Sequence, residues 1–85
     1  MAKFELTPAS RRYIGERIAE HLARENAFKS DISYLTNASY VGGAEMVLMW
    51  MEIPHCVHMS DDHKRYVSFE LDGETFPVLS EEATP

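Results

Sequence analysis

The stretch YVSFELDGETFPVL, residues 66–79, decides the fold class of this chain. In its first six residues, apolar side chains alternate with polar or amphipathic ones, the period-two pattern of a half-buried β-strand. Val67, Phe69 and Leu71 are therefore expected on one face of a strand. Tyr66, Ser68 and Glu70 are expected on the opposite face.

The turn that follows this strand is marked by Asp72-Gly73. This pair is the strongest short-range hairpin signal, because a type I′ turn requires positive φ at both central residues. Residues 75–79 then return as the partner strand, and Pro77 indicates an edge position because proline cannot donate to the ladder. The stretch predicts a β-hairpin with its turn over residues 71–74.

A further strand is expected just upstream, over residues 55–59 (HCVHM). Alternation places Val57 and Met59 on the inward side and Cys56 and His58 on the outward side. The segment SDDHK, residues 60–64, would then be the turn into the central strand. These segments predict a small antiparallel meander.

The first helix is predicted over about residues 8–27. Thr7 is a good capping residue, and Pro8 suits the first helical position, where its missing N–H costs nothing. The apolar stripe repeats every four residues at Ile14, Ile18 and Leu22. Charged residues occupy another face with the same spacing: Arg12, Glu16, Glu20 and Arg24. Gly15 costs the helix about 1 kcal/mol relative to alanine, so either a neighbour packs closely there or the helix tolerates the loss.

A second helical segment is expected over about residues 31–53, interrupted near Gly42-Gly43. Its later part, residues 44–53 (AEMVLMWMEI), is apolar on every side, so periodicity alone does not separate a buried helix from a buried strand. Good helix formers dominate it and favour the helix. The fold class is therefore α+β in one domain of residues 1–85, with helices covering the apolar face of the sheet and a frayed acidic tail at 80–85.

Composition restricts the class of protein. The chain has 85 residues, 45% of them hydrophobic, and a single cysteine, so a packed core is expected and an internal disulfide is impossible. Charges interrupt residues 1–12 every few positions, which is unlike a secretory leader. The longest apolar run, residues 46–51, is far short of the ~20 residues of a membrane span. We therefore expect a soluble cytoplasmic protein.

The net charge of −6 is distributed unevenly, with +2 on residues 1–30 and −8 on residues 31–85. An overall negative charge disfavours direct binding to nucleic acid. The acidic half, including Asp61 and Asp62, could instead contact a basic partner, or mimic nucleic acid and compete for a protein that binds it. The alternative is a solvated surface that keeps a small protein in solution.

The stretch HCVHMSDDH, residues 55–63, is the strongest candidate for a metal site. Cys56 and His58 share one side of the expected strand, and a turn could return His63 to them. A thiolate with two imidazoles is a competent zinc ligand set. However, the spacing matches none of the paired ligand hooks of zinc motifs, and a polar strand and turn with no metal is the alternative.

We find no sequence signature of an enzyme. The chain has no glycine-rich phosphate loop, no G-x-S-x-G and no helical metal motif. Cys56 and His58 would be neighbours on a strand, with no helix N-terminus to lower the pKa of the thiol. We therefore expect no catalytic residues and no cofactor, apart from the zinc alternative.

The excess of large apolar residues is the most informative functional feature. If residues 44–53 are helical, Met46, Met49, Trp50 and Ile53 lie on one face. Val41, Ala44, Val47, Leu48 and Met51 lie on another. One helix and a small sheet offer limited area to cover both faces, and Met and Trp are enriched at interfaces. Either the segment is a core element covered on both sides, or one face stays open for a partner or a second copy.

The sequence therefore predicts a small non-enzymatic protein-interaction module, an adaptor or inhibitor that occupies the surface of another protein. We expect it to form a homodimer. Its partner-binding residues would be Met46, Met49, Trp50 and Ile53, with Asp61 and Asp62. Compact acidic inhibitors made by phages and other mobile elements are an analogy in size and charge only. The alternatives are a zinc-binding domain using Cys56, His58 and His63, and an acidic mimic of nucleic acid.

Overall fold

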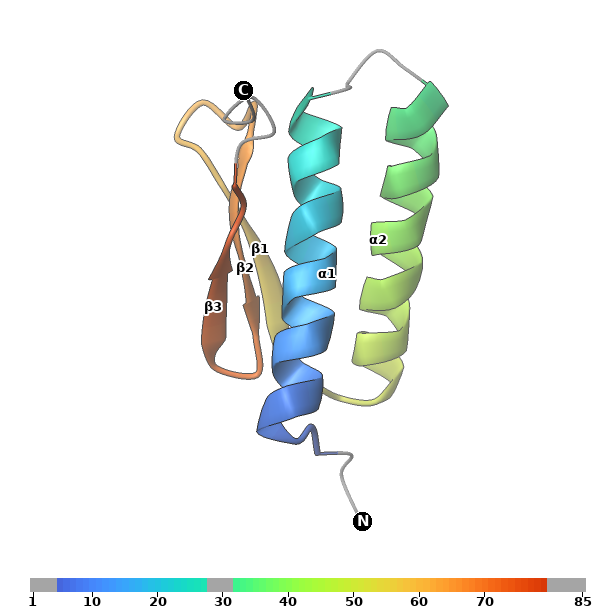
Figure 1. Cartoon of the computed structure of the whole chain (residues 1–85), viewed down its shortest axis with the longest axis vertical. Coiled ribbons are helices and arrows are strands. Elements are labelled where there is room, and N and C mark those ends of the chain that lie inside the picture. The colour runs from blue at the N-terminus through green and yellow to red at the C-terminus, as the bar shows by residue number, and fades with distance from the viewer. Residues whose placement is uncertain (1–4, 28–31, 80–85) are drawn as a thin grey trace.

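In the computed structural model, the described residues are 5–27 and 32–79, with the side chains of 32–37 excepted. Two helices, α1 (Pro8–Ala27) and α2 (Ile32–Trp50), precede three strands, β1 (His55–Met59), β2 (Tyr66–Leu71) and β3 (Glu74–Pro77). The strands form one antiparallel sheet in the order β1-β2-β3. Helix α1 lies between the sheet and α2 (Figure 1). The predicted α+β fold is confirmed, whereas the expected helix start at residue 31 and the tail at 80–85 lie outside the described residues.

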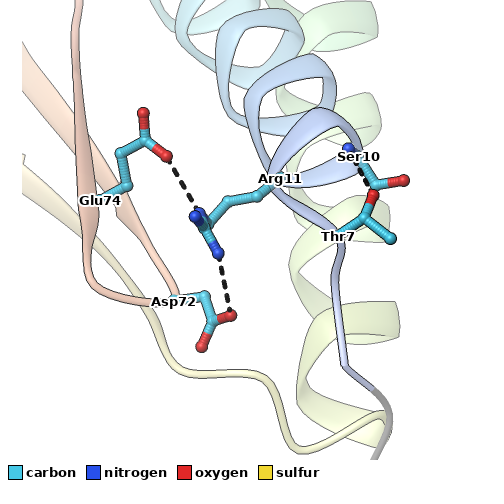
Figure 2. A network of polar contacts seen from close by, with 5 residues as sticks. All are labelled: Thr7, Ser10, Arg11, Asp72 and Glu74. Carbon is cyan, nitrogen blue, oxygen red and sulfur yellow. Dashed lines mark hydrogen bonds and ion pairs between the residues drawn. The ribbon is translucent and has the colours of Figure 1, made fainter.

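Polar contacts in the first turn of α1 cap the helix and connect it to the sheet (Figure 2). Thr7 Oγ1 accepts a hydrogen bond from the Ser10 N–H at 3.0 Å, which confirms the predicted cap. One residue further on, Arg11 Nε donates to Glu74 Oε1 at 3.0 Å, and its Nη1 lies 3.7 Å from Asp72 Oδ2. The β2–β3 hairpin is thereby attached to the start of α1.

Two further contacts hold α1 against the sheet. The Phe76 ring lies so close to Gly15 that a Cβ at that position would overlap it, which is the close neighbour that a glycine in the middle of α1 suggests. Near the other end of the helix, the side-chain amide of Asn26 pairs with the backbone of Tyr66. Its Nδ2 donates to the Tyr66 carbonyl and its Oδ1 accepts from the Tyr66 N–H, both at 2.9 Å.

The core forms where α1 meets both the sheet and α2. Ile18 and Leu22 are fully buried there, as the apolar stripe predicts. They belong to one cluster with residues of α2 and of the sheet: Val41, Leu48, Ile53, Phe69, Leu71 and Phe76. The predicted charged stripe of α1, with Arg12 and Glu16 at its start, faces solvent.

The β2–β3 hairpin matches its prediction. Asp72 and Gly73 have φ values of 51° and 89°, so both central residues of the turn have positive φ. Phe69 pairs with Phe76 across the two strands, and β3 with Pro77 forms an edge of the sheet. The strand bounds differ slightly from the expected 75–79, because β3 runs over Glu74–Pro77.

The expected side-chain alternation fails at one end of the sheet. His58 pairs with Ser68 but Met59 pairs with Tyr66, so Val67 has no partner in β1. This bulge brings Tyr66 partly into the core and leaves both Val67 and Met59 exposed, contrary to the expected inward positions of the last two.

The predicted interruption of the second helix at Gly42-Gly43 is wrong. Helix α2 passes through both glycines without a break. A glycine inside a helix costs about 1 kcal/mol but does not prevent helical φ and ψ. Buried Val41 on one side of the pair and Leu48 on the other anchor α2 to the core, which offsets that cost.

The end of α2 also differs from the expected residue 53. The Glu52 N–H bonds to the Met49 carbonyl, and the Ile53 N–H bonds to the Leu48 carbonyl at 2.9 Å. With Glu52 at a φ of 59°, these bonds form a Schellman motif that ends the helix at Trp50. The chain reverses there, and Ile53 packs in the same core cluster as Leu48.

Two glycine-to-alanine substitutions should have opposite effects on stability. We expect Gly15→Ala to lower the free energy of unfolding by about 2 kcal/mol, because the buried Phe76 ring has little room to move. Gly42→Ala is the matched control: apart from its chain neighbours and the nearby backbone of its own helix, no atom of the described residues lies within 4 Å of a Cβ at Gly42. It should raise the free energy by up to about 1 kcal/mol. Urea titration measures both, and equal effects of the two substitutions would contradict the close packing.

Candidate functional site

Helix α2 carries large apolar side chains on its exposed surface. Tyr40, at the edge of this surface, also contacts α1, since its ring stacks on His21 with the ring centres 3.9 Å apart. Over its 19 residues, Glu45 is the single charged residue. We call five exposed residues the outer face of α2: Tyr40, Met46, Val47, Met49 and Trp50. Trp50 is 68% exposed and Met49 is 58% exposed, values typical of polar surface residues. Such a concentration of exposed apolar side chains on one helix marks a candidate binding surface.

A shallow apolar groove adjoins this face. It lies between α1 and α2, has a volume of about 280 Å³, and is closed at its base by Ile14, Ile18 and Leu48. Tyr40 and Val47 of the outer face form part of its rim. On the α1 side, exposed Tyr13 stands beside Arg17, whose guanidinium carbon lies 5.2 Å from the centre of the Tyr13 ring. The groove extends the apolar surface from α2 onto α1.

The structure brings together three of the six residues predicted to bind a partner. Met46, Met49 and Trp50 are neighbours on the outer face. Ile53 does not join them, since the reversal of the chain after the helix buries it to 5% exposure. The helical pattern missed this because Ile53 lies beyond the end of the helix.

The two predicted acidic contacts also lie elsewhere. Asp61 and Asp62 belong to the β1–β2 turn, at the opposite end of the molecule from the C-terminal end of α2 (Figure 1). Asp62 Oδ1 accepts hydrogen bonds from Ser60 Oγ at 2.6 Å and from the Lys64 N–H at 3.1 Å. Asp62 therefore holds the turn together, and the acidic pair is separate from the apolar surface.

Sequence reasoning missed Tyr40 and Val47 as members of the outer face. Val47 was expected on the same face as Val41 and Leu48, yet it is exposed. Tyr40 lies seven residues before Val47, two turns away on the same side of α2. That spacing would have identified the pair once the helix was known to run through the glycines.

The structure does not bring the predicted zinc ligands together. Among residues 5–27 and 32–79, no group of three or more His, Cys, Asp and Glu side chains is placed to hold a metal ion. His58 Nε2 instead lies 3.2 Å from Glu70 Oε1 on the neighbouring strand. His55 is half-buried, with its Nδ1 2.9 Å from the Ile53 carbonyl, and His63 lies in the turn with a φ of 60°.

A buried carboxyl group lies where the C-terminal part of α1 meets α2 and the sheet. Glu25 is only 2% exposed, and its Oε2 accepts no hydrogen bond from any described residue. Burial raises the pKa of Glu25 above its ordinary value of 4.5, and Glu45 of α2 acts in the same direction. Tyr66, through a side-chain hydrogen bond, and His21 oppose the increase in pKa. Sequence reasoning missed this group, although Glu25 lies seven residues after Ile18 on the buried side of α1.

Neither helix of the described ranges combines the length and apolar character needed to cross a membrane. The exposed apolar side chains of α2 lie on a helix that packs against α1. This surface can bind another molecule by burying apolar area against it.

The position of Cys56 gives a prediction about metal binding. We expect Cys56→Ser to leave the melting temperature unchanged with either added zinc or added chelator, because the thiol is exposed and donates a long hydrogen bond, 3.7 Å, to the Val57 carbonyl. His58→Ala should behave in the same way with zinc. A loss of both bound metal and stability in Cys56→Ser would support a zinc site instead.

Burial of Glu25 gives a prediction about pH. A carboxyl group with a raised pKa keeps its proton to a higher pH in the folded state than in the unfolded chain. Its stabilising contribution is complete below the unfolded value of about 4.5 and is lost as the pH rises through the folded pKa. Glu25→Gln should therefore gain stability relative to the wild type as the pH rises above about 4.5 and through the raised pKa of Glu25.

Urea titrations at several pH values measure this difference. Glu16→Gln, an exposed glutamate on the same helix, is the matched control. A difference between Glu25→Gln and the wild type that stays constant over the whole range would show that Glu25 does not couple to folding.

The geometry is thus that of an exposed apolar helix face, a groove beside it, and a buried carboxyl group behind it. Comparisons with known proteins found no family model, no curated protein and no solved structure that matches the chain.

Proposed function

We propose that this protein is a protein-interaction module that acts by occupying the surface of a partner with the outer face of α2. The observation that supports the proposal is the exposure of Met46, Met49 and Trp50 on a helix with one charged residue. An apolar patch of this kind is unfavourable in water unless another surface covers it.

The residue types on this face suit a protein partner. Tyr, Trp and Met are enriched in the buried centres of protein interfaces, and Trp is the commonest energetic hot spot with Tyr and Arg. Trp50 is the last residue of α2 and lies one turn after Met46 and directly after Met49, so two methionines adjoin it on the outer face. Methionine side chains adapt to irregular surfaces, which suits a partner of different shape.

The attachment of α2 to the core also favours binding by its outer face. Buried Val41 and Leu48 attach α2 to α1, and the Schellman motif fixes the end of the helix beside Trp50. The face is therefore rigid before binding, and little conformational entropy is lost when a partner is bound. A small domain with one rigid apolar face can act as an adaptor or as an inhibitor by excluding other molecules from its partner.

The acidic side chains give less support to a contact surface on the sheet. Asp72 and Glu74 are engaged by Arg11, and Glu70 lies beside His58. These contacts reduce the carboxylate charge that is available to a basic partner. We therefore assign the main contact to α2 and not to an acidic mimic of nucleic acid.

A photoreactive amino acid at position 49 tests this function in cells that contain the protein. We expect crosslinked adducts from position 49 and none from position 59, an exposed methionine at the far end of β1. Trp50→Ala should abolish the adducts or reduce them strongly, because removal of a hot-spot aromatic costs about 2 kcal/mol or more, roughly 30-fold in affinity.

The mass of each adduct identifies the bound molecule. An adduct at twice the chain mass contains a second copy, and any other mass contains a different protein. Equal crosslinking from positions 49 and 59, or none from position 49, would contradict the proposed role of α2.

A further inference from the structure

We propose that the outer face of α2 binds a second copy of this chain, with the two α2 helices antiparallel and the two sheets at the outer ends of the dimer. This inference rests on the proposed function and names the partner. It follows from the area of the face, the distribution of charge and the order of large and small residues along α2.

The exposed apolar area is sufficient for a small dimer interface. With about 200 Å² for a large side chain, the exposed fractions of the five outer-face residues correspond to roughly 500 Å² per chain. Exposed Tyr13 at the rim of the groove adds about another 100 Å². A typical stable interface buries about 800 Å² per partner, so this area indicates a specific dimer at the lower end of the size range.

Charge directs the contact to the same face. Two chains with a net charge of −6 each repel one another, and the repulsion is least where the approaching surfaces are neutral. From residue 38 to residue 50, α2 carries Glu45 as its single charge, and this residue is half-buried on the side opposite Trp50. The acids of the hairpin and of the β1–β2 turn lie beyond α1 on the far side of the molecule (Figure 1).

The order of residues on α2 favours the antiparallel arrangement. Ser39, Gly43, Met46 and Trp50 are all exposed and follow the 4-3-4 spacing of a helix-packing seam. An antiparallel pair places Trp50 of one copy against Ser39 of the other, and Met46 against Gly43. Each large side chain then faces a small one, as close packing requires. A parallel pair would place Trp50 against Trp50 and leave the two Gly43 residues facing a gap.

Trp50 makes the dimer directly measurable, because it is the only tryptophan of the chain. Static light scattering and Trp50 emission are recorded together during dilution from about 500 µM to below about 1 µM, the range expected for a small interface. We expect the mass to fall from two chains to one while the emission shifts to the red. The two curves should share one midpoint.

Two methionine substitutions of the same kind localise the interface. Met46→Asp places a carboxylate in the centre of the seam and should raise the dissociation constant at least 100-fold, because a buried unpaired charge is strongly unfavourable. Met59→Asp is the matched control, since Met59 is 40% exposed and Met46 is 48% exposed. It should leave the dissociation constant unchanged. Circular dichroism establishes that each variant is folded.

Gly43→Leu tests the antiparallel packing. Apart from its chain neighbours and the nearby backbone of its own helix, no atom of the described residues lies within 4 Å of a Cβ at Gly43. The isolated chain therefore has room for the new side chain, and its helix gains propensity. In the antiparallel dimer the leucine would collide with Met46 of the second copy. We expect a dissociation constant at least tenfold higher. An unchanged or lower value would overturn the antiparallel packing.

The remaining outcomes separate the dimer from the proposed function. A wild-type chain that keeps the mass of one copy at the highest concentration, with solvent-exposed Trp50 emission, overturns the dimer and leaves the contact with another protein to the crosslinking test. A dimer that survives Met46→Asp, or is lost in Met59→Asp, overturns this interface. If Met46→Asp and Trp50→Ala both unfold the chain, the face belongs to the core and both proposals fail.

Discussion

The position of α1 between the sheet and α2 is the constraint on which the rest of the structure depends. Gly15 admits the Phe76 ring on the sheet side of α1, and the Asn26 amide binds the Tyr66 backbone on the same side. The sheet therefore packs on one side of α1, and α2 packs on another. Since α2 has no second layer of the described structure beyond it, its outer side chains stay exposed (Figure 1).

The same arrangement buries a carboxyl group, that of Glu25, where ionisation is unfavourable. The side of α1 that meets α2 includes Glu25, and Glu45 of α2 adds a second carboxyl group to its surroundings. The buried carboxyl group lowers the stability of the folded chain, and the exposed apolar face adds no burial to it. A chain of this length buries only about 60–65% of its unfolded surface, so its margin of stability is small.

Sequence reasoning succeeded where the signal was local. The Thr7 cap and the Asp72-Gly73 turn each depend on a few neighbouring residues, and the structure has both as predicted. It failed where tertiary contacts decide. Buried Val41 before Gly42-Gly43 and buried Leu48 after it hold α2 as one helix, and a bulge at Val67 changes the side-chain alternation of β2. For the candidate site, the pattern identified the exposed methionines and tryptophan of α2. It also included Ile53, because the reversal of the chain after Trp50 depends on backbone bonds that side-chain pattern does not encode.

That reversal links the end of the fold to the candidate surface. The Schellman bonds bury Ile53 beside Leu48, and the same bonds end the helix at Trp50, so the next residues cannot fold back over its ring. A longer helix would have placed Ile53 on the outer face and left the core without a buried side chain at this end. Trp50 is exposed because the chain turns toward the core directly after it. The core and the exposed face are therefore two consequences of one helix end, and a substitution that loosened this end would alter both together.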